Sequence, residues 1–139
     1  MSKQIYINLP VKDLTKATEF YTALGFIKNE QWSSEDASAM AFSDDILVML
    51  LTHQFYGGFT IKIIPDLDLT SSVLIALSMD TREEVDAFAK KAKELGGSYF
   101  EAEPNKGLDF MYGLEVTDLD GHTLEPFYMD LSKLPSQTN

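Results

Sequence analysis

Glu125 is the side chain in this sequence with the clearest chemical potential. In the segment 122–129 alternate residues face opposite sides of an expected strand, so Glu125 shares a face with Phe127. Burial beside apolar side chains raises the pKa of a carboxyl group, because the charged form loses its hydration. We therefore expect Glu125 to act as a general base or to anchor a cationic ligand. In either case we expect a hydrogen-bond donor for the buried carboxylate, which could be Tyr6 or Asn8. The alternative to these functions is a carboxylate with a purely structural role.

The two histidines are the other side chains that could transfer protons near neutral pH. His122 is three residues from Glu125, so strand parity places it on the opposite face, and we expect it to be solvent-exposed or bonded to a turn. His53 shares the parity of Met49 at the end of an expected strand over 46–52. If that strand continues, His53 lies at the rim of the site as an acid or base; otherwise it is an ordinary loop histidine.

The elements that position these side chains repeat one pattern. Alternating apolar residues over 7–11 predict a strand, and a helix is expected from Asp13, a good N-cap, to Gly25, a good C-terminal stop. The same pattern returns 68 residues later, where alternating residues over 75–79 precede a helix that begins at Thr81. The repeat indicates one supersecondary module that is used twice.

Each expected helix is followed by three expected strands, so each module has the order β-α-β-β-β. The strands are Phe26–Trp32, Ala37–Phe42 and Ile46–Thr52 in the first module, and Ser98–Ala102, Phe110–Thr117 and His122–Met129 in the second. The modules span 4–52 and 72–130, and are followed by a polar tail at 131–139. The linker 53–71 contains Gly57-Gly58 and Pro65, which predict an irregular segment. We expect a single α+β domain in which two tandem β-α-β-β-β modules form a curled-sheet cup, a shape typical of small-molecule sites.

The composition excludes several classes of function. The 139 residues include 22 acidic and 11 basic side chains, which gives a net charge of −11. This charge disfavours binding to nucleic acids and to anionic membranes. The absence of cysteine excludes disulfides, thiolate zinc sites and cysteine nucleophiles. No apolar run reaches the length of a signal peptide core or a membrane span, so a cytoplasmic location is expected.

Two motifs resemble a known superfamily. The opening Asn8-Leu9-Pro10-Val11-Lys12-Asp13-Leu14 and the closing Asp118-Leu119-Asp120-Gly121-His122, followed by Glu125, resemble the vicinal oxygen chelate superfamily. This superfamily contains glyoxalase I, bleomycin-resistance proteins and extradiol dioxygenases. The resemblance covers residues 4–130 and implies the glyoxalase/bleomycin-resistance-like fold and a homodimer. It does not imply one activity, because one scaffold serves isomerases, lyases, dioxygenases and drug-binding proteins.

The resemblance also implies four metal-ligand positions, which fall on Tyr6, Met49, Leu74 and Glu125. Zinc, nickel and iron sites in proteins need about three histidine or carboxylate ligands, and only Glu125 is of this kind. We therefore expect no divalent metal of the family type and no other cofactor. The alternative is a metal site built partly from His53 and Glu125.

The predicted function follows from the side chains expected around Glu125 in the cup. The expected ligand-binding residues are Tyr6, Asn8, Met49, Leu74, Met111 and Phe127. The single arginine, Arg82, is expected to be exposed, so no arginine is placed to bind the carboxylates of glutathione. We predict a metal-independent glyoxalase/bleomycin-resistance-like protein that binds a neutral or cationic small organic molecule. The alternatives are a metal-dependent lyase (lactoylglutathione-lyase-like) or dioxygenase, and an interaction module whose own side chains fill the cup.

Overall fold

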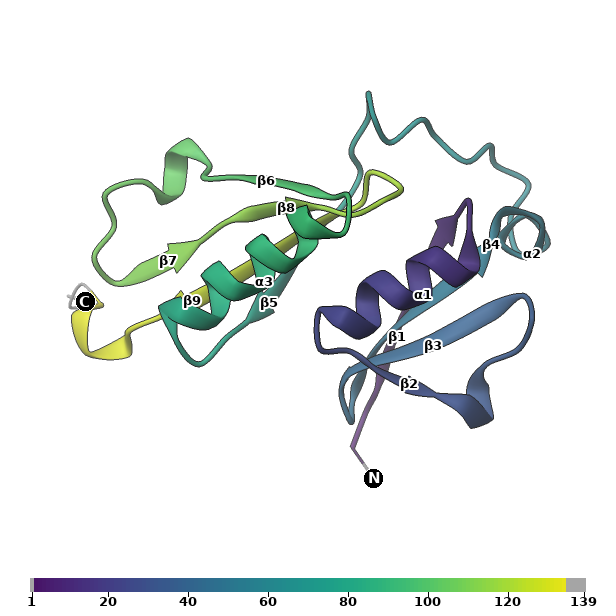
Figure 1. Ribbon diagram of the computed structural model, residues 1–139, viewed down its shortest axis with the longest axis horizontal. Helices are drawn as coiled ribbons and strands as arrows, with labels where there is room; N and C mark the ends of the chain where they lie inside the picture. Colours follow the sequence, from purple (N-terminus) through teal and green to yellow (C-terminus); the bar gives the residue numbers. More distant parts are fainter. Residues whose placement is uncertain (1, 135–139) are drawn as a thin grey trace. The chain divides into compact units, whose positions relative to one another are not determined.

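The chain folds into two compact units, each with a helix across one face of a sheet (Figure 1). The computed structural model describes residues 2–134. The first unit comprises the described residues up to Thr70 together with Leu119–His122. The second comprises Ser71–Asp118 and the described residues from Thr123 onward. Within residues 2–134, no helix has the length and apolar character needed to cross a membrane.

The first unit contains a four-stranded sheet. Its elements are β1 (Ile5–Val11), α1 (Leu14–Ala23), β2 (Ile27–Asn29), the 3₁₀ helix η1 (Glu30–Trp32), β3 (Ala37–Ser43), β4 (Ile46–Thr52) and α2 (His53–Gly57). The strand order is β1-β4-β3-β2, with β1 parallel to β4 and the other pairs antiparallel. This arrangement is the β-α-β-β-β module that the sequence predicts.

The ends of α1 are set by the two residues that the sequence indicates. Asp13 Oδ1 accepts a hydrogen bond from the amide of Lys16 at 3.0 Å, which satisfies one of the free amides of the first turn. Gly25 follows the helix with a φ of 103°, a conformation that glycine adopts without steric cost. Between these ends, Ala17 and Phe20 are buried against the sheet. The helical spacing of the apolar residues therefore decides which face of α1 packs on the strands.

The second unit repeats this topology. Its elements are β5 (Leu74–Ser78), α3 (Arg82–Glu94), β6 (Ser98–Phe100), the 3₁₀ helix η2 (Glu103–Asn105), β7 (Met111–Gly113), β8 (Glu115–Thr117), β9 (Thr123–Met129) and the 3₁₀ helix η3 (Leu131–Lys133). The strand order is β5-β9-β8-β6, β5 and β9 are parallel, and β7 also pairs with β9. The expected strand Phe110–Thr117 is thus divided into β7 and β8. The α+β class and the tandem modules are confirmed.

The capping box that begins α3 fixes the start of this helix. Thr81 Oγ1 accepts from the amide of Glu84 at 3.1 Å, and Glu84 Oε2 accepts from the amide of Asp80 at 2.9 Å. Val85 and Phe88 lie on the buried face of the helix, which contacts β9 and the neighbouring strands. The opposite face of the second sheet is therefore left for a site.

Two expected elements differ because a polar side chain bonds to nearby backbone amides. The strand predicted to run to Trp32 ends at Asn29, whose Oδ1 accepts from the amides of Gln31 and Trp32 and so begins η1. Just before the predicted polar tail, Asp130 Oδ1 accepts from the amide of Ser132 in the same way and caps η3. Positions 135–139 of that tail lie outside the described residues.

The linker is irregular only in part. Thr52 Oγ1 accepts from the amide of Phe55 at 3.1 Å and caps α2, so the prediction of an irregular segment is wrong for His53–Gly57. From Gly58 to Val73 the chain contains no helix or strand, as predicted (Figure 1).

The turn 119–122 belongs to the first unit, although the strands that it joins belong to the second. Asp120 Oδ1 accepts from the amide of Lys12 at 2.8 Å. Gly121 has a φ of 96°, and a Cβ at this position would lie 2.8 Å from the Cβ of Leu67. Only glycine fits this combination of backbone conformation and close contact.

Candidate functional site

A cavity lies on the face of the second sheet opposite α3. Three cross-strand pairs follow one another along this face: Met111 with Met129, Gly113 with Phe127, and Glu115 with Glu125. The first two pairs belong to the register of β7 and β9. The third follows because Val116 pairs with Leu124 in the same antiparallel ladder, and each step along one strand is matched by a step along the other. We call Glu115 and Glu125 the carboxyl pair.

The cavity combines an apolar end with an acidic end. Its volume is about 250 Å³, and besides the three pairs it is lined by Ala76, Asn105, Leu114 and Pro126. A Cβ on Gly113 would lie 3.3 Å from the Cβ of Phe127, so the glycine keeps this part of the cavity open. Methionine side chains adapt to ligands of varied shape. The arrangement suits an elongated molecule with an apolar body and one polar group.

The carboxyl pair has unusual protonation chemistry because one member is buried. Glu115 is only 7% exposed. Burial, then the hydrogen bond to Glu125 and the negative charge of Glu125, raise the pKa of Glu115 from 4.5 to about 7. Near neutral pH the Glu115 carboxyl group is therefore partly protonated, and it can both donate and accept hydrogen bonds.

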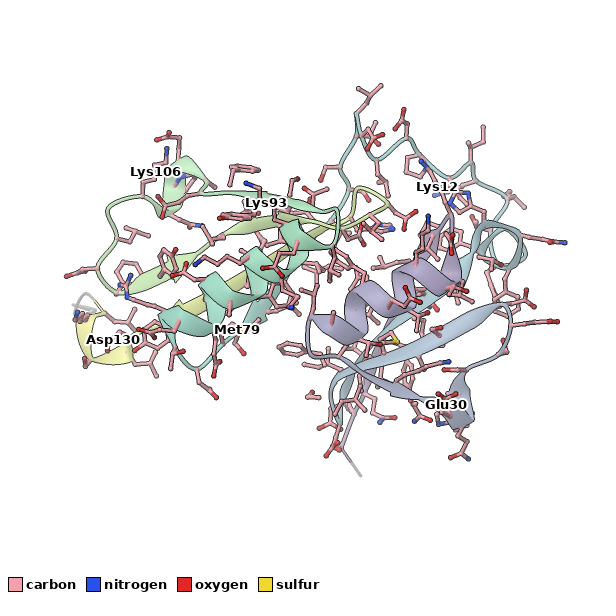
Figure 2. All side chains as sticks on the ribbon, viewed as in Figure 1. Lys12, Glu30, Met79, Lys93, Lys106 and Asp130 are labelled. Carbon is pink, nitrogen blue, oxygen red and sulfur yellow. The ribbon has the colours of Figure 1, made fainter. Side chains whose placement is uncertain are left out.

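Asn105 adds an amide to this cavity. It ends η2 and directly precedes Lys106 (Figure 2). Lys106 Nζ lies 2.8 Å from Glu103 Oε1 in the same short turn. Asn105 Nδ2 lies 3.6 Å from where a Cβ of Gly113 would be. The side-chain amide provides donors and an acceptor without charge, so the polar chemistry of the cavity is not restricted to the carboxyl pair.

The structure brings three of the predicted site residues together in this cavity. Glu125, Met111 and Phe127 line it in common. Leu74 lies on the same face of β5, two residues before Ala76, which is the register partner of Glu125, but it does not line the cavity.

The other predicted ligand-binding residues lie in the first unit. Tyr6, Asn8 and Met49 share the face of the first sheet opposite α1, and Asn8 pairs with Met49. Asn8 lines a separate cavity of about 360 Å³ together with Leu51, Tyr56, Phe59 and Thr60. Strand parity is thus correct for these residues.

Glu125 has a side-chain partner within its own unit that the sequence analysis did not name, which is Glu115. A hydrogen bond from Tyr6 or Asn8 to Glu125 stays a prediction, because these residues belong to the other unit. Tyr6 Oη donates to Gln4 Oε1 at 3.0 Å. The signal for Glu115 was present in the sequence, because a hairpin around the turn 119–122 places it opposite Glu125.

The two histidines lie in different environments, and that of His122 differs from the expected exposure. His53 begins α2 because β4 ends at Thr52, so the strand parity that placed it at a rim does not apply. It is exposed and lines a cavity of about 340 Å³ in the first unit that also contacts Lys12, just after β1 (Figure 2). His122 is buried rather than exposed, and its Nε2 lies 2.8 Å from the carbonyl oxygen of Pro10. The turn that contains His122 packs against the end of β1.

Comparison with known proteins identifies the family. A family model described as Glyoxalase/Bleomycin resistance protein/Dioxygenase superfamily matches residues 3–125, and the chain belongs to this superfamily. No curated protein sequence matches the chain.

Solved structures share the fold. The hypothetical protein SA1046 from S. aureus has a TM-score of 0.76 and 28% identity, covering 92% of this chain and 94% of that chain. A glyoxalase/bleomycin resistance protein/dioxygenase family enzyme from Burkholderia phytofirmans PsJN has a TM-score of 0.72 and 16% identity, covering 92% and 99%. The fosfomycin resistance protein FosX from Listeria monocytogenes has a TM-score of 0.67 and 20% identity, covering 96% and 98%.

The residues present do not fit a divalent metal centre of the family type. The four positions implied for ligands are occupied by Tyr6, Met49, Leu74 and Glu125, and a leucine has no donor atom. Among the described residues, no group of three or more histidine, cysteine, aspartate or glutamate side chains could hold a metal ion. A catalytic zinc or iron site needs about three such ligands.

Proposed function

We propose that this protein binds a small organic molecule in the cavity of the second unit, without the divalent metal of its superfamily. The observation that supports the proposal is the carboxyl pair at one end of a cavity whose lining is otherwise apolar except for Asn105. Two acidic groups side by side raise the free energy of the folded protein unless a proton or a ligand offsets their repulsion. Such a pair therefore favours a binding role over a structural one.

The ligand class follows from charge and shape. A protonated amine or a neutral hydrogen-bond donor can bind the carboxyl pair, whereas an anion would be repelled by it and by a chain of net charge −11. Phe127 and the two methionines offer apolar contact to the rest of the molecule, and an aromatic ring also attracts cations. We propose neutral and cationic amphipathic molecules as ligands.

Proton transfer is a second candidate role for the same pair. A general acid or base works best when its pKa is close to the operating pH, and the pKa of Glu115 is raised to about 7. With Glu125 beside it, the pair could remove a proton from a carbon acid bound in the cavity. In this role the protein would convert the molecule that it binds, and the reaction would need no metal.

A screen by thermal shift tests the proposed binding. Compounds are grouped as cationic, neutral and anionic at pH 7, and are matched for apolar area. We expect raised melting temperatures from the first two groups only, because a ligand that binds the native state stabilises it. Hits confined to anions, or no hit from any group, would contradict the proposal; the latter would favour an interaction module.

We also propose that the protein is a homodimer. Closed two-fold dimers are the commonest oligomers of soluble proteins, and the sheets of both units end in edge strands that can pair further. A monomer mass by sedimentation at micromolar concentration would contradict this.

A further inference from the structure

Two methionines face each other at the apolar end of the cavity in the second unit. Met111 in β7 is the register partner of Met129 in β9. Next to them in the ladder, the amide of Asp130 donates to the carbonyl oxygen of Phe110 at 2.7 Å. That neighbouring pair is hydrogen-bonded, so the two methionines form a non-hydrogen-bonded pair, the kind in which cross-strand side chains are closest. We call Met111 and Met129 the methionine pair.

The methionine pair is accessible to small molecules in solution. Met129 is 36% exposed and Met111 is half-buried, and both line the cavity. Among the methionines of residues 2–134, Met40 is 0% exposed, and Met79 is half-buried and does not line this cavity (Figure 2). The chain has no cysteine, so its thioethers are its sulfur groups. An oxidant that attacks sulfur therefore meets Met129 before the other described methionines.

The methionine pair and the carboxyl pair lie at opposite ends of the cavity. Gly113 and Phe127, the cross-strand pair between them, separate the two along the same ladder. The separation is four residues along a strand, which is roughly 13 Å at ~3.3 Å per residue. A ligand whose amine binds the carboxyl pair would therefore place its apolar body at the methionine pair. The apolar character of that end depends on the two thioethers.

We propose that the methionine pair is an oxidation site whose state controls ligand binding in this cavity. The inference rests on the proposed function and adds regulation to it. The oxidant is a hydroperoxide: the methionine sulfur attacks the terminal peroxide oxygen and the O–O bond breaks. The proton of the transferred oxygen passes to the leaving oxygen, so the products are a sulfoxide and an alcohol, or water from hydrogen peroxide. Sulfur loses two electrons and the peroxide gains them.

Oxidation would replace an apolar surface by a polar one. A sulfoxide oxygen accepts hydrogen bonds from water, and an apolar ligand body that covers it removes this water without replacing the hydrogen bonds. The carboxyl pair is unchanged, so the ligand would lose only its apolar contacts, and we expect the affinity to fall at least tenfold. The effect would be reversible, because sulfoxide reductases restore methionine. Conversely, a bound ligand would cover both sulfur atoms and slow their oxidation.

Isothermal titration calorimetry before and after oxidation tests the effect on binding. The probe is 4-phenylbutylamine, a cation with an apolar body, and the oxidant is hydrogen peroxide, which is removed before titration. We expect the wild type to lose affinity at least tenfold and to regain it after treatment with sulfoxide reductases and a dithiol. Met111→Leu/Met129→Leu should have the same affinity before and after peroxide, whereas the control Met79→Leu should respond like the wild type. Circular dichroism melting verifies that each oxidised protein is folded.

Peptide mass spectrometry locates the oxidised sulfur atoms. Glu115 and Glu125 lie between the two methionines in the sequence, so cleavage after glutamate separates them. We expect Met129 to gain oxygen faster than Met40. Saturating 4-phenylbutylamine should slow the oxidation of the methionine pair and leave that of Met79 unchanged.

The possible failures are distinguishable. Reduced wild type that does not bind 4-phenylbutylamine would overturn both the proposed binding and this inference. Unchanged affinity after complete oxidation of the methionine pair would overturn this inference alone. An equal loss of affinity in Met111→Leu/Met129→Leu, or an oxidised wild type that has unfolded, would overturn it as well, because the cause would then lie outside the methionine pair or in the fold.

Discussion

The buried member of the carboxyl pair should make the stability of the second unit depend on pH. Because the pKa of Glu115 is raised from 4.5 to about 7 in the folded state, its stabilising contribution is complete below pH 4.5 and is lost as the pH rises through 7. We expect the free energy of unfolding to fall by roughly 1–3 kcal/mol between pH 4.5 and 8 from this group. Urea denaturation at a series of pH values measures it.

Glu115→Gln should remove this dependence, since a neutral side chain of the same shape cannot titrate. The variant should be more stable than the wild type at pH 8. Glu94→Gln, at an exposed position of α3, is the control and should keep the wild-type pH profile. Identical profiles for wild type and Glu115→Gln would show that Glu115 titrates normally.

The other member of the pair should decide affinity for cationic ligands. Glu125→Gln should weaken a cationic hit from the thermal-shift screen by tenfold or more, which is ~1.4 kcal/mol for each factor of ten. Isothermal titration calorimetry at pH 7 measures the change, with Glu94→Gln again as the unaffected control. If Glu125→Gln binds such a hit as tightly as wild type, Glu125 has only a structural role.

Sequence analysis identified one member of the carboxyl pair. The parity of β9 identifies Glu125, and the hairpin register would have identified Glu115 as its neighbour. The burial of Glu115 could not have been predicted in this way, because it depends on side chains from β6 to β9 and the η2 loop that come together only in the folded sheet. The environment of His122 was missed for the same reason, since its partner Pro10 is far away in sequence.

Among the elements, α3 and β7 are joined by a side-chain contact that can be tested directly. Tyr112 Oη donates to Asp86 Oδ1 at 2.5 Å, and the guanidinium of Arg82 lies 5.3 Å from the centre of the Tyr112 ring. Tyr112→Phe should lower the free energy of unfolding by about 0.5–1.5 kcal/mol at pH 7, the usual range for one hydrogen bond. Tyr99→Phe, on exposed β6, should change it little.

This contact should also weaken at high pH. Burial and the hydrogen bond to Asp86 raise the pKa of Tyr112 to about 12. The contribution of the tyrosine is therefore complete below pH 10 and is lost as the pH rises through 12. Absorbance of tyrosinate near 295 nm should show that Tyr112→Phe lacks a group that titrates near pH 12 in the wild type. Titration curves whose difference lies near pH 10 would contradict the assignment.

Sequence patterns predicted the regular elements better than the short ones. The caps at Asp13 and Thr81 and the helical spacing behind them act locally, so both long helices were predicted at their correct positions. The short elements η1 and α2 were missed because Asn29 and Thr52 bond to backbone amides just beyond a strand. Such a bond favours a turn over continuation of the strand by a small difference in free energy. A pattern of apolar residues does not reveal this difference.

For the whole molecule, metal content separates the proposed function from its main alternative. Purified protein should contain far less than one equivalent of zinc, nickel, iron or manganese, as measured by elemental mass spectrometry. The reason is that three of the four implied ligand positions hold Tyr6, Met49 and Leu74. Leu74→His should not create a stoichiometric site, since two ligands are too few. Stoichiometric metal that survives dialysis and is lost in Glu125→Ala would indicate a metal-dependent lyase or dioxygenase instead.

The turn that returns to the first unit has a consequence for how the protein is made. The contacts of Asp120 with Lys12 and of His122 with Pro10 join residues 108 and 112 positions apart. During synthesis the first unit can form its sheet early, but these contacts wait until residue 122 of 139 has been translated. Contacts of such sequence separation slow folding, because the intervening chain must be ordered first. A nascent chain arrested before residue 119 should therefore be cleaved by protease near Pro10 and Leu67, and the full-length chain should be protected there.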